Sequence, residues 1–405
     1  MSRLRARLMR LLFPAPRTGV APSPPGAASS AATSLPGVAT SPSPLRNPQS
    51  AIRILIVRPD HLGDLLLAGP ALAALRAALP AAHLTGLVGP WGQPIWERLP
   101  SLDAVETLPF PGIVARPARP WQPYTLLWTQ ARRLRAGCYD LAVILRFDYW
   151  WGALLAEQAR ISVRWGYGLP AVAPFLTHPV PYQVGRHEVA QNLALVAALT
   201  ATEPGTVPMP DPTPGRPPLD FPLTADDSAW AAAHLPALGR TVAIHPGTNG
   251  SLKLWTLDGW AAVAAWLAAQ GYHVVFTGSA AEAPLVAAIQ ARMEPPAAAA
   301  TTDLAGQTSL GQLAALFAGC AAVLGVDSGP LHIATAVGPP TVRLYGPSDE
   351  AIWGPWGSPT RHRVVRAPGT QPGHFLDPTR TALEGGAEMQ AIPAAQVIGA
   401  LATVL

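Results

Sequence analysis

The stretch "AAVLGVDSGPLHIATAVGPPTVRLYG", residues 321–346, decides the fold of this chain. An apolar run that ends at Asp327 has the composition of a buried strand, and Ser328-Gly329 then form a tight turn. Pro330 suits the first turn of a helix, and the apolar run "TVRLYG" after the helical segment is a second strand. A strand, a helix and a strand in this order predict a parallel sheet with helices on its faces.

The same pattern extends over the chain and predicts two domains. From residue 51 onward, short β-branched and aliphatic runs alternate with Ala- and Leu-rich helical runs, and the Pro- and Gly-rich segment 200–223 has the composition of a connector. We therefore expect an α/β fold with two doubly wound, Rossmann-like domains, 51–212 and 213–405, facing each other across a cleft. Other strands are expected at 52–58, 83–89, 104–110, 140–146, 241–247 and 273–278, and helices at 64–79 with a break near Gly69-Pro70, at 122–136 and at 186–199.

Composition limits the class of protein. A length of 405 residues with 49% apolar residues is enough for two hydrophobic cores. Only 13% of the residues are charged, yet no apolar run reaches the length of a membrane-spanning helix, so a membrane-spanning chain is not expected. Cys138 and Cys320 lie far apart without metal-ligand spacing, and we expect both to be core thiols in a reducing compartment.

Charge is concentrated at the start of the chain. Residues 1–50 carry six Arg and no acidic residue, which leaves 22 basic and 24 acidic residues in the remainder, so nucleic acid is not an expected partner. In residues 1–13, leucines and arginines fall on two faces of a helix, which suits peripheral contact with the anionic cytoplasmic face of a membrane. The alternative is a frayed basic tail, or a start codon placed too early. Residues 15–50 have the composition of a disordered linker attached to a cytoplasmic protein.

Polar residues gather where the expected strands end. Four such stretches are "PDHLGD" (59–64), "HPGTNGSLK" (245–253), "TGSAAE" (277–282) and "DSGPLH" (327–332). Ligands of doubly wound sheets bind beyond the carboxyl ends of the strands. The four stretches together therefore predict a binding site.

A diphosphate is the ligand that the second domain suits. Free amides at the helix start after Ser328-Gly329, with the positive end of the helix dipole, favour an anion. Lys253 is the one lysine beside 27 arginines, and a lysine can direct a single compact charge at the same phosphate. The alternatives are that Asp327 or Ser328 caps the helix and that His332 is a core histidine.

Two carboxylates are further candidates for residues of the binding and catalytic site. Glu282 suits hydrogen bonds to a ribose, with an ordinary helix-start carboxylate as the alternative. Asp64, at the start of the first domain's helix, can accept a proton from an attacking hydroxyl, with a first-turn acid as the alternative. Asp60 and His61, on the same loop, are weaker candidates on the acceptor side.

Basic side chains of the first domain could meet an anionic acceptor. Arg146 is the acceptor-side candidate among them. Arg132, Arg133 and Arg135 fit a solvated basic face better.

These stretches, together with "RPDHLGDLLLAGPALAALRAALP" (58–80), "DLAGQTSLGQLAALFAGCAAVLGVDSGPLHIATAVGPPTVRLYGPSD" (303–349) and "WGPWG" (353–357), resemble glycosyltransferase family 9, the ADP-heptose:lipopolysaccharide heptosyltransferases. The resemblance runs in order from about residue 51 to residue 360. It implies a GT-B fold, with the acceptor bound by the first domain and the nucleotide sugar by the second. It also implies inverting transfer without a metal or cofactor, from an ADP-linked donor such as ADP-heptose to a cell-envelope glycan or glycolipid such as lipopolysaccharide core.

The resemblance also implies roles for individual residues. Asp64 matches the family's catalytic base, which deprotonates the acceptor hydroxyl before that oxygen displaces the diphosphate. The residues that match donor-binding positions are Thr248, Lys253, Glu282, Asp327, Ser328, Gly329 and His332. Lys253 and the helix start at Gly329 would neutralise the charge of the leaving diphosphate.

Several departures from the family pattern bear on the acceptor. Pro59-Asp60-His61 stands where many members have a short stretch containing Ser or Thr, and Leu254 stands where a basic residue is common. Ser328 replaces the more usual threonine and keeps the hydroxyl. The resemblance therefore supports sugar transfer better than it supports lipopolysaccharide as the acceptor.

Three other functions compete with this interpretation. A nicotinamide-dependent dehydrogenase shares the architecture, but GxGxxG is missing after the first strand. A non-catalytic nucleotide or glycan binder is the second, and a transferase that uses another nucleotide sugar for cell-wall or capsule glycan is the third. Retention of Asp64, Lys253 and Asp327 argues against the non-catalytic binder.

Overall fold

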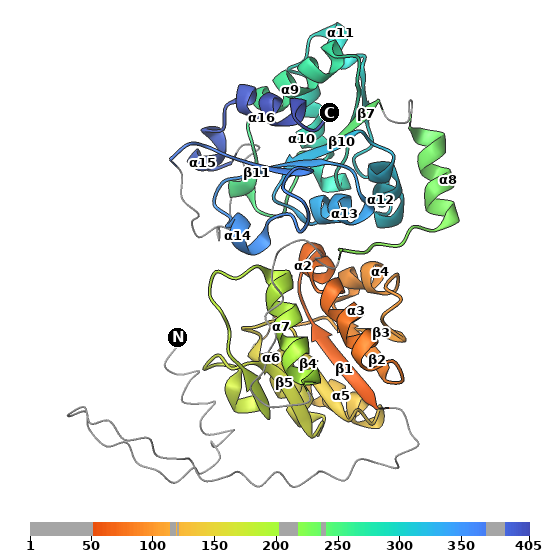
Figure 1. Cartoon of the computed structure of the whole chain (residues 1–405), viewed down its shortest axis with the longest axis vertical. Coiled ribbons are helices and arrows are strands. Elements are labelled where there is room, and N and C mark those ends of the chain that lie inside the picture. Colours follow the sequence, from red (N-terminus) through yellow and green to blue (C-terminus); the bar gives the residue numbers. More distant parts are fainter. Residues whose placement is uncertain (1–51, 114–118, 120, 202–217, 236–239, 370–384) are drawn as a thin grey trace, which may run out of the picture. The chain divides into compact units, whose positions relative to one another are not determined.

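The described part of the chain contains two parallel six-stranded sheets, each with helices on both faces (Figure 1). The computed structural model describes residues 52–113, 119, 121–201, 218–235, 240–369 and 385–405. The expectations for residues 1–50 and the domain boundary at 212/213 fall outside these residues.

The first sheet has the strand order β3-β2-β1-β4-β5-β6, which is the order of a dinucleotide-binding Rossmann fold. Its strands are β1 (Arg53–Arg58), β2 (His83–Val88), β3 (Ala104–Thr107), β4 (Leu141–Ile144), β5 (Val163–Tyr167) and β6 (His178–Val180). Its helices are α2 (Leu62–Leu67), α3 (Gly69–Ala78), α4 (Gln93–Trp96), α5 (Gln122–Ala136), α6 (Trp150–Gln158) and α7 (Glu188–Thr200). The break predicted near Gly69-Pro70 separates α2 from α3.

The second sheet repeats this topology, with the order β12-β11-β10-β7-β8-β9. Its strands are β7 (Thr241–His245), β8 (His273–Phe276), β9 (Thr301–Asp303), β10 (Ala322–Val326), β11 (Thr341–Tyr345) and β12 (His362–Arg366). Its helices are α8 (Ala225–His234), α9 (Leu257–Ala269), α10 (Ala283–Gln290), α11 (Pro295–Ala298), α12 (Leu310–Ala318), α13 (Gly329–Val337), α14 (Glu350–Trp353), α15 (Ala387–Gln390) and α16 (Ala394–Ala402). The strand order reverses between β1 and β4 in the first sheet and between β7 and β10 in the second, and ligands of such sheets bind at these points.

Alternation along β1 shows how the sequence builds the layers. Ile54 and Ile56 face one core, whereas Leu55 and Val57 face another on the opposite side of the sheet. Both faces of the strand are thus covered, which explains its unbroken run of aliphatic residues.

One apolar core continues from the first lobe into the second. It contains Leu65 and Leu72 of the first lobe together with Phe317 and Leu331 of the second. His187, the residue before α7, adds a polar contact, because its Nε2 lies 3.2 Å from the carbonyl oxygen of Gly354. No described helix has the length and apolar composition needed to cross a membrane.

The expectation that both cysteines are core thiols is wrong for Cys138. Cys320 is buried, but Cys138 is exposed. Cys138 lies in the turn between α5 and β4 with a φ of 51°, and the next residue, Tyr139, takes the buried position instead. The sequence prediction also missed β5, β6, β9 and β12, which are short or lie toward the edges of the sheets.

Candidate active site

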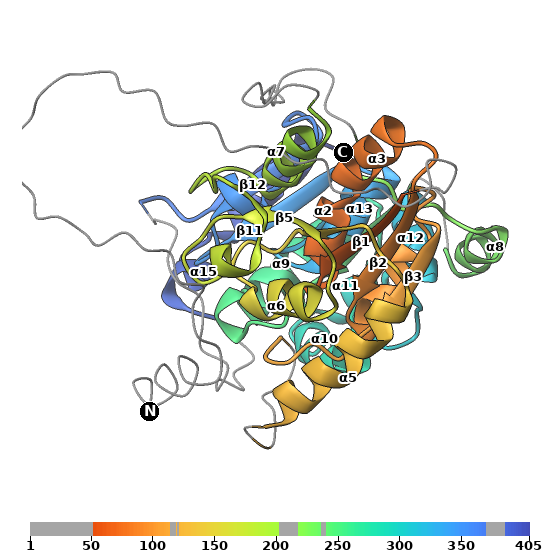
Figure 2. The same ribbon diagram turned by 90° about the horizontal axis from the view of Figure 1, so that it is seen from below.

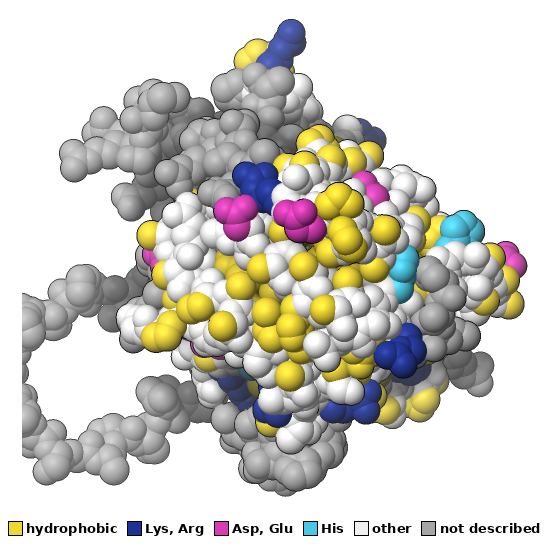
Figure 3. Space-filling model, turned by 90° about the horizontal axis from the view of Figure 1, so that it is seen from above, with side chains coloured by type: hydrophobic (Ala, Val, Ile, Leu, Met, Phe, Trp, Pro, Cys, Tyr) yellow, Lys and Arg dark blue, Asp and Glu magenta, His cyan; other side chains and the backbone are white. Residues whose placement is uncertain are grey.

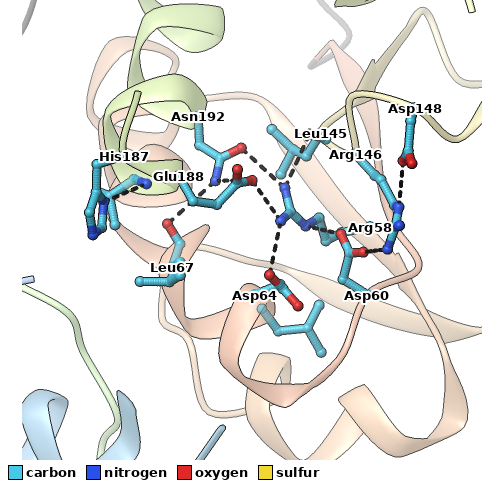
Figure 4. Close-up of polar contacts among 12 residues, drawn as sticks. Arg58, Asp60, Asp64, Leu67, Leu145, Arg146, Asp148, His187, Glu188 and Asn192 are labelled. Atoms are coloured by element: carbon cyan, nitrogen blue, oxygen red, sulfur yellow. Dashed lines mark hydrogen bonds and ion pairs between the residues drawn. The ribbon is translucent and has the colours of Figure 1, made fainter. Parts of the chain in front are cut away.

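A buried arginine organises the reversal point of the first sheet (Figure 4). Arg58, the last residue of β1, is 2% exposed. Its Nη2 lies 2.7 Å from Glu188 Oε1 on α7, and its Nε lies 2.5 Å from Asp60 Oδ2. Its Nη1 donates to the Leu145 carbonyl at 3.1 Å and to Asn192 Oδ1 at 3.2 Å. This guanidinium therefore ties together β1, β4, α7 and the loop before α2.

Asp64 lies at the edge of this network, in the first turn of α2. Its carboxylate is 26% exposed, and its Oδ1 lies 4.0 Å from Arg58 Nη2. Burial, followed by the neighbouring Asp60 and Glu188, raises the pKa of Asp64 to about 7, although Arg58 opposes this shift. A carboxylate with a pKa near neutrality and partial access to solvent is suited to general-base chemistry.

The acceptor-side candidates do not all face solvent. Asp60 is 2% exposed and bridges two arginines, since Arg146 Nη1 also contacts its Oδ1. Arg146 Nε further binds Asp148 Oδ1 at 2.7 Å. His61 is exposed and makes no side-chain capping bond to α2. His61 and Arg146 are therefore accessible to solvent, while Asp60 holds Arg146 in position.

Two predicted donor residues form an ion pair at the reversal point of the second sheet. Lys253 Nζ lies 2.6 Å from Asp327 Oδ2, and the two side chains are 16% and 9% exposed. Thr248 Oγ1 donates to the Asp327 carbonyl oxygen at 3.3 Å. The loop after β7 and the end of β10 are therefore joined, as predicted, with the ammonium held in a fixed place.

The start of α13 has the features of an anion site. Ser328 precedes the helix, but its side chain makes no capping bond, and its Oγ is buried without a hydrogen-bond partner among the described residues. The expected alternative, a simple cap by Ser328 or Asp327, is therefore not what the structure shows. Pro330 has no N–H, and Leu331 N donates to the Ser328 carbonyl oxygen at 3.2 Å. The Gly329 amide and the Ser328 hydroxyl are therefore the groups of this turn that remain available for an anion.

The starts of α2 and α13 are in direct contact. A Cβ atom added to Gly63 would lie 3.0 Å from His332 Cδ2 and 3.4 Å from Gly329 Cα. One added to Gly329 would lie 3.2 Å from the Gly63 nitrogen. The two helix starts can come this close because both residues are glycines without a Cβ atom. The contact places Asp64, the residue after Gly63, beside the candidate anion site.

His332 is buried and has a defined tautomer. Arg343 Nη1 lies 3.3 Å from His332 Nδ1, and an arginine can only donate, so Nδ1 carries no proton. Burial lowers the pKa of His332 well below its ordinary value, and Arg343 lowers it further, so the ring is neutral. His332 Nε2 therefore carries the N–H group, on the side of the ring that faces Gly63.

Glu282 has a structural contact of its own. Its Oε2 accepts hydrogen bonds from Ser279 N at 2.6 Å and from Ser279 Oγ at 2.8 Å, which is the helix-start role named above as the alternative. Its Oε1 lies close to Gly247, where a Cβ atom would approach to 2.0 Å. Glu282 therefore borders the donor loop, and its contact with a ribose stays a prediction.

Four buried residues of the site were not predicted. They are Arg58, Glu188, Asn192 and Arg343. From the sequence, Glu188 is placed only within the predicted helix 186–199 and Arg58 only at the end of the predicted strand 52–58. The one available signal was the charge of Arg58 and Arg343 inside otherwise apolar strands, since unpaired charge is rare there. Among the described residues no group of three or more His, Cys, Asp or Glu is arranged to hold a metal ion.

Replacement of Glu188 by Gln is expected to lower the pKa of Asp64, because Glu188 is one of the charges that raise it. If Asp64 is the general base of sugar transfer, the fall of the transfer rate at low pH (the acidic limb of the pH–rate profile) should move to lower pH by up to about one unit. Asp258→Asn is the matched control, because Asp258 is 84% exposed and pairs with Arg292 outside the site. An unchanged acidic limb in Glu188→Gln would contradict the assignment of that limb to Asp64.

Comparison with known proteins identifies the family. The sequence profile of glycosyltransferase family 9 (heptosyltransferase) matches residues 127–373. The chain is 29% identical over 329 residues to lipopolysaccharide heptosyltransferase 3 of Escherichia coli K12, covering 75% of this chain and 89% of that protein. E. coli ADP-heptose lps heptosyltransferase II has the same fold, with a TM-score of 0.69 at 23% identity over 87% of this chain and 98% of that one.

A second solved structure carries a donor analogue. E. coli heptosyltransferase WaaC with ADP-2-deoxy-2-fluoro heptose matches at a TM-score of 0.59 and 22% identity, covering 84% of this chain and 96% of that one. The profile spans more than half of the chain, and both solved structures share its two-sheet architecture. The chain belongs to glycosyltransferase family 9 and is a glycosyltransferase with the GT-B fold.

Proposed function

We propose that this glycosyltransferase moves a heptose from ADP-heptose to a hydroxyl group of a lipopolysaccharide core acceptor, with inversion and without a metal ion. The observation that carries the proposal is the contact between Gly63 and Gly329. It puts Asp64, a carboxylate with a pKa of about 7, beside the Gly329 amide at the start of α13, a helix start without a side-chain cap. Direct displacement requires a general base for the attacking hydroxyl and a site that stabilises the leaving group.

The reaction is a single displacement. Asp64 accepts the proton of the acceptor hydroxyl, and the oxygen forms a bond to the anomeric carbon of the donor sugar. The bond between that carbon and the diphosphate oxygen breaks, and its electron pair leaves with the diphosphate. Attack from the face opposite the leaving group inverts the anomeric configuration.

Charge on the leaving diphosphate is met by the protein. Lys253 supplies an ammonium that Asp327 holds at 2.6 Å, and the Gly329 amide at the start of α13 supplies a hydrogen bond. The Ser328 hydroxyl and His332 Nε2–H are two further donors in the same region. Preorganised donors of this kind stabilise developing negative charge by several kcal/mol, which removes the need for a cation.

The relatives support the choice of substrates. The proteins that align with about three quarters of this chain include lipopolysaccharide and lipooligosaccharide heptosyltransferases, and one structural neighbour holds ADP-2-deoxy-2-fluoro heptose. Arg146 and His61 suit the acceptor side, because they reach the surface next to Asp64 and provide groups for an anionic glycan.

A nucleotide titration followed by a transfer assay tests the proposal. Calorimetry should show that ADP binds and that UDP, GDP and NAD bind at least about tenfold more weakly, since a nucleotide site discriminates through hydrogen bonds to the base. Mass spectrometry of a lipopolysaccharide acceptor incubated with ADP-heptose should then show one added heptose. Preference for UDP or GDP would overturn the donor, and donor binding without transfer would point to a non-catalytic binder.

A further inference from the structure

Helix α5 presents two exposed tryptophans on its outer face. Trp121, just before the helix, is 56% exposed and Trp128 is 58% exposed. They are the only large exposed aromatic side chains among the described residues. Positions seven residues apart lie one above the other after two helical turns. Leu127, Ala131 and Leu134 form the opposite, buried face, so the tryptophans are not needed for the core.

Arginines continue the same stripe. Arg132 and Arg135 follow Trp128 at helical spacing and are exposed. Neither has a carboxylate within ion-pair distance in the part of the chain that the structure describes. Arg135 donates only to a carbonyl oxygen, that of Gln158, at 2.7 Å. Both side chains therefore keep an uncompensated charge at the surface.

The sequence around α5 is free of acids. Residues 107–139 contain five Arg and no Asp, Glu or Lys, although acidic residues outnumber basic ones after residue 50. One of the five, Arg133, is neutralised by Glu106 at 2.6 Å, and another, Arg119, lies over the Trp121 ring at 5.6 Å. By contrast, the face of the molecule that is seen from above in Figure 3 carries few charged side chains, and these are of both signs.

We propose that this face, Trp121, Thr125, Trp128, Arg132 and Arg135, docks on the surface of an anionic lipid membrane. Tryptophan is the side chain most suited to the boundary between headgroups and acyl chains, since its ring is apolar and its N–H is polar. Arginines beside it are attracted to anionic headgroups. The absence of acidic residues from 107–139 favours this occupant over a protein surface of mixed charge.

The position of α5 agrees with this role. Figure 2 shows α5 next to α6 on the outside of the first lobe. Trp151 Nε1, at the start of α6, donates to the Pro123 carbonyl at 3.3 Å, so the tryptophan end of α5 lies at the carboxyl edge of the first sheet. Arg146 lies at that edge, just after β4. A membrane against α5 would therefore run close to the acceptor side, and the docking does not depend on which sugar is transferred.

Vesicle sedimentation of the full chain tests the proposal. The probes are vesicles of phosphatidylcholine with about one third phosphatidylglycerol, and vesicles of phosphatidylcholine alone. Trp121→Ser/Trp128→Ser and Arg132→Gln/Arg135→Gln should each weaken binding to the anionic vesicles by about fivefold or more. Arg240→Gln/Arg361→Gln is the matched control, since it removes the same charge from exposed positions of the second lobe, and it should change binding by less than about twofold.

Three results would overturn the proposal. The first is that the Trp121→Ser/Trp128→Ser variant binds the anionic vesicles as well as the parent protein. The second is that the Arg132→Gln/Arg135→Gln variant and its control, Arg240→Gln/Arg361→Gln, lose vesicle binding equally. The third is a tryptophan pair that alters the monomer–dimer equilibrium in sedimentation velocity but not lipid binding, because the face would then join two copies of the chain. Unchanged circular dichroism and nucleotide affinity would show that each variant is folded.

Discussion

Replacement of Asp64 by Asn is expected to reduce sugar transfer by about a thousandfold, within the range that general-base catalysis supplies. An amide of the same size cannot accept the acceptor's proton, whereas the proposed donor site at the start of α13 and Lys253 is left intact. The affinity for ADP, measured by calorimetry, should therefore stay within about twofold, because binding and proton transfer use different groups. Substantial transfer by this variant would assign the base to another residue, with the exposed His61 on the same loop as the next candidate.

The same carboxylate is expected to determine how the rate of sugar transfer depends on pH. Because the pKa of Asp64 is raised to about 7, kcat/KM should fall as the pH decreases below 7, by about tenfold per unit. Asp64 also affects stability. Its folded-state pKa lies above the ordinary 3.8, so its favourable contribution is present below about pH 4 and is lost as the pH rises through 7. Asp64→Asn should thus raise the melting temperature at pH 8, with Asp258→Asn as the matched control.

Replacement of Lys253 by Met is expected to weaken ADP binding by about ten- to a hundredfold, the size of a lost charge-assisted hydrogen bond. Transfer should fall further than binding, because the charge on the diphosphate grows as the bond breaks. Lys253→Arg should recover part of the affinity, since it keeps the charge but replaces a compact ammonium by a planar group.

A second variant separates binding from folding in this experiment. Lys253→Met alone leaves the largely buried Asp327 without its partner, which destabilises the fold. Lys253→Met/Asp327→Asn removes both charges and should melt near the parent temperature while still binding ADP weakly. Full ADP affinity in either variant would exclude Lys253 from the donor site.

The sequence predicted the elements whose signals are local. The break between α2 and α3 follows from Gly69-Pro70, and α5 was predicted with its observed bounds because its apolar residues recur at helical spacing. Strands such as β6 and β9 span only three residues and carry little periodicity. They form because a neighbouring strand offers hydrogen bonds, which a single sequence does not reveal.

The residues of the candidate site could likewise be predicted where they lie in local sequence motifs. Asp64 and Lys253 lie in motifs with a recognisable order, so their proximity to strand ends could be inferred. Arg58 and Glu188 are 130 residues apart, and their ion pair exists only because β1 and α7 meet in the fold. The exposure of Trp128 could not be predicted either, since the same spacing would have suited a core position.

The apolar core that runs through both lobes links their stabilities. Phe317 and Leu331 of the second lobe pack in the same cluster as Leu65 and Leu72 of the first, so these contacts are lost together when either lobe opens. The lobes are therefore expected to unfold cooperatively. A nucleotide that binds only the native second lobe then stabilises the first lobe as well, by mass action. Donor binding thus protects the helix that bears Asp64 from local unfolding, although that helix belongs to the other sheet.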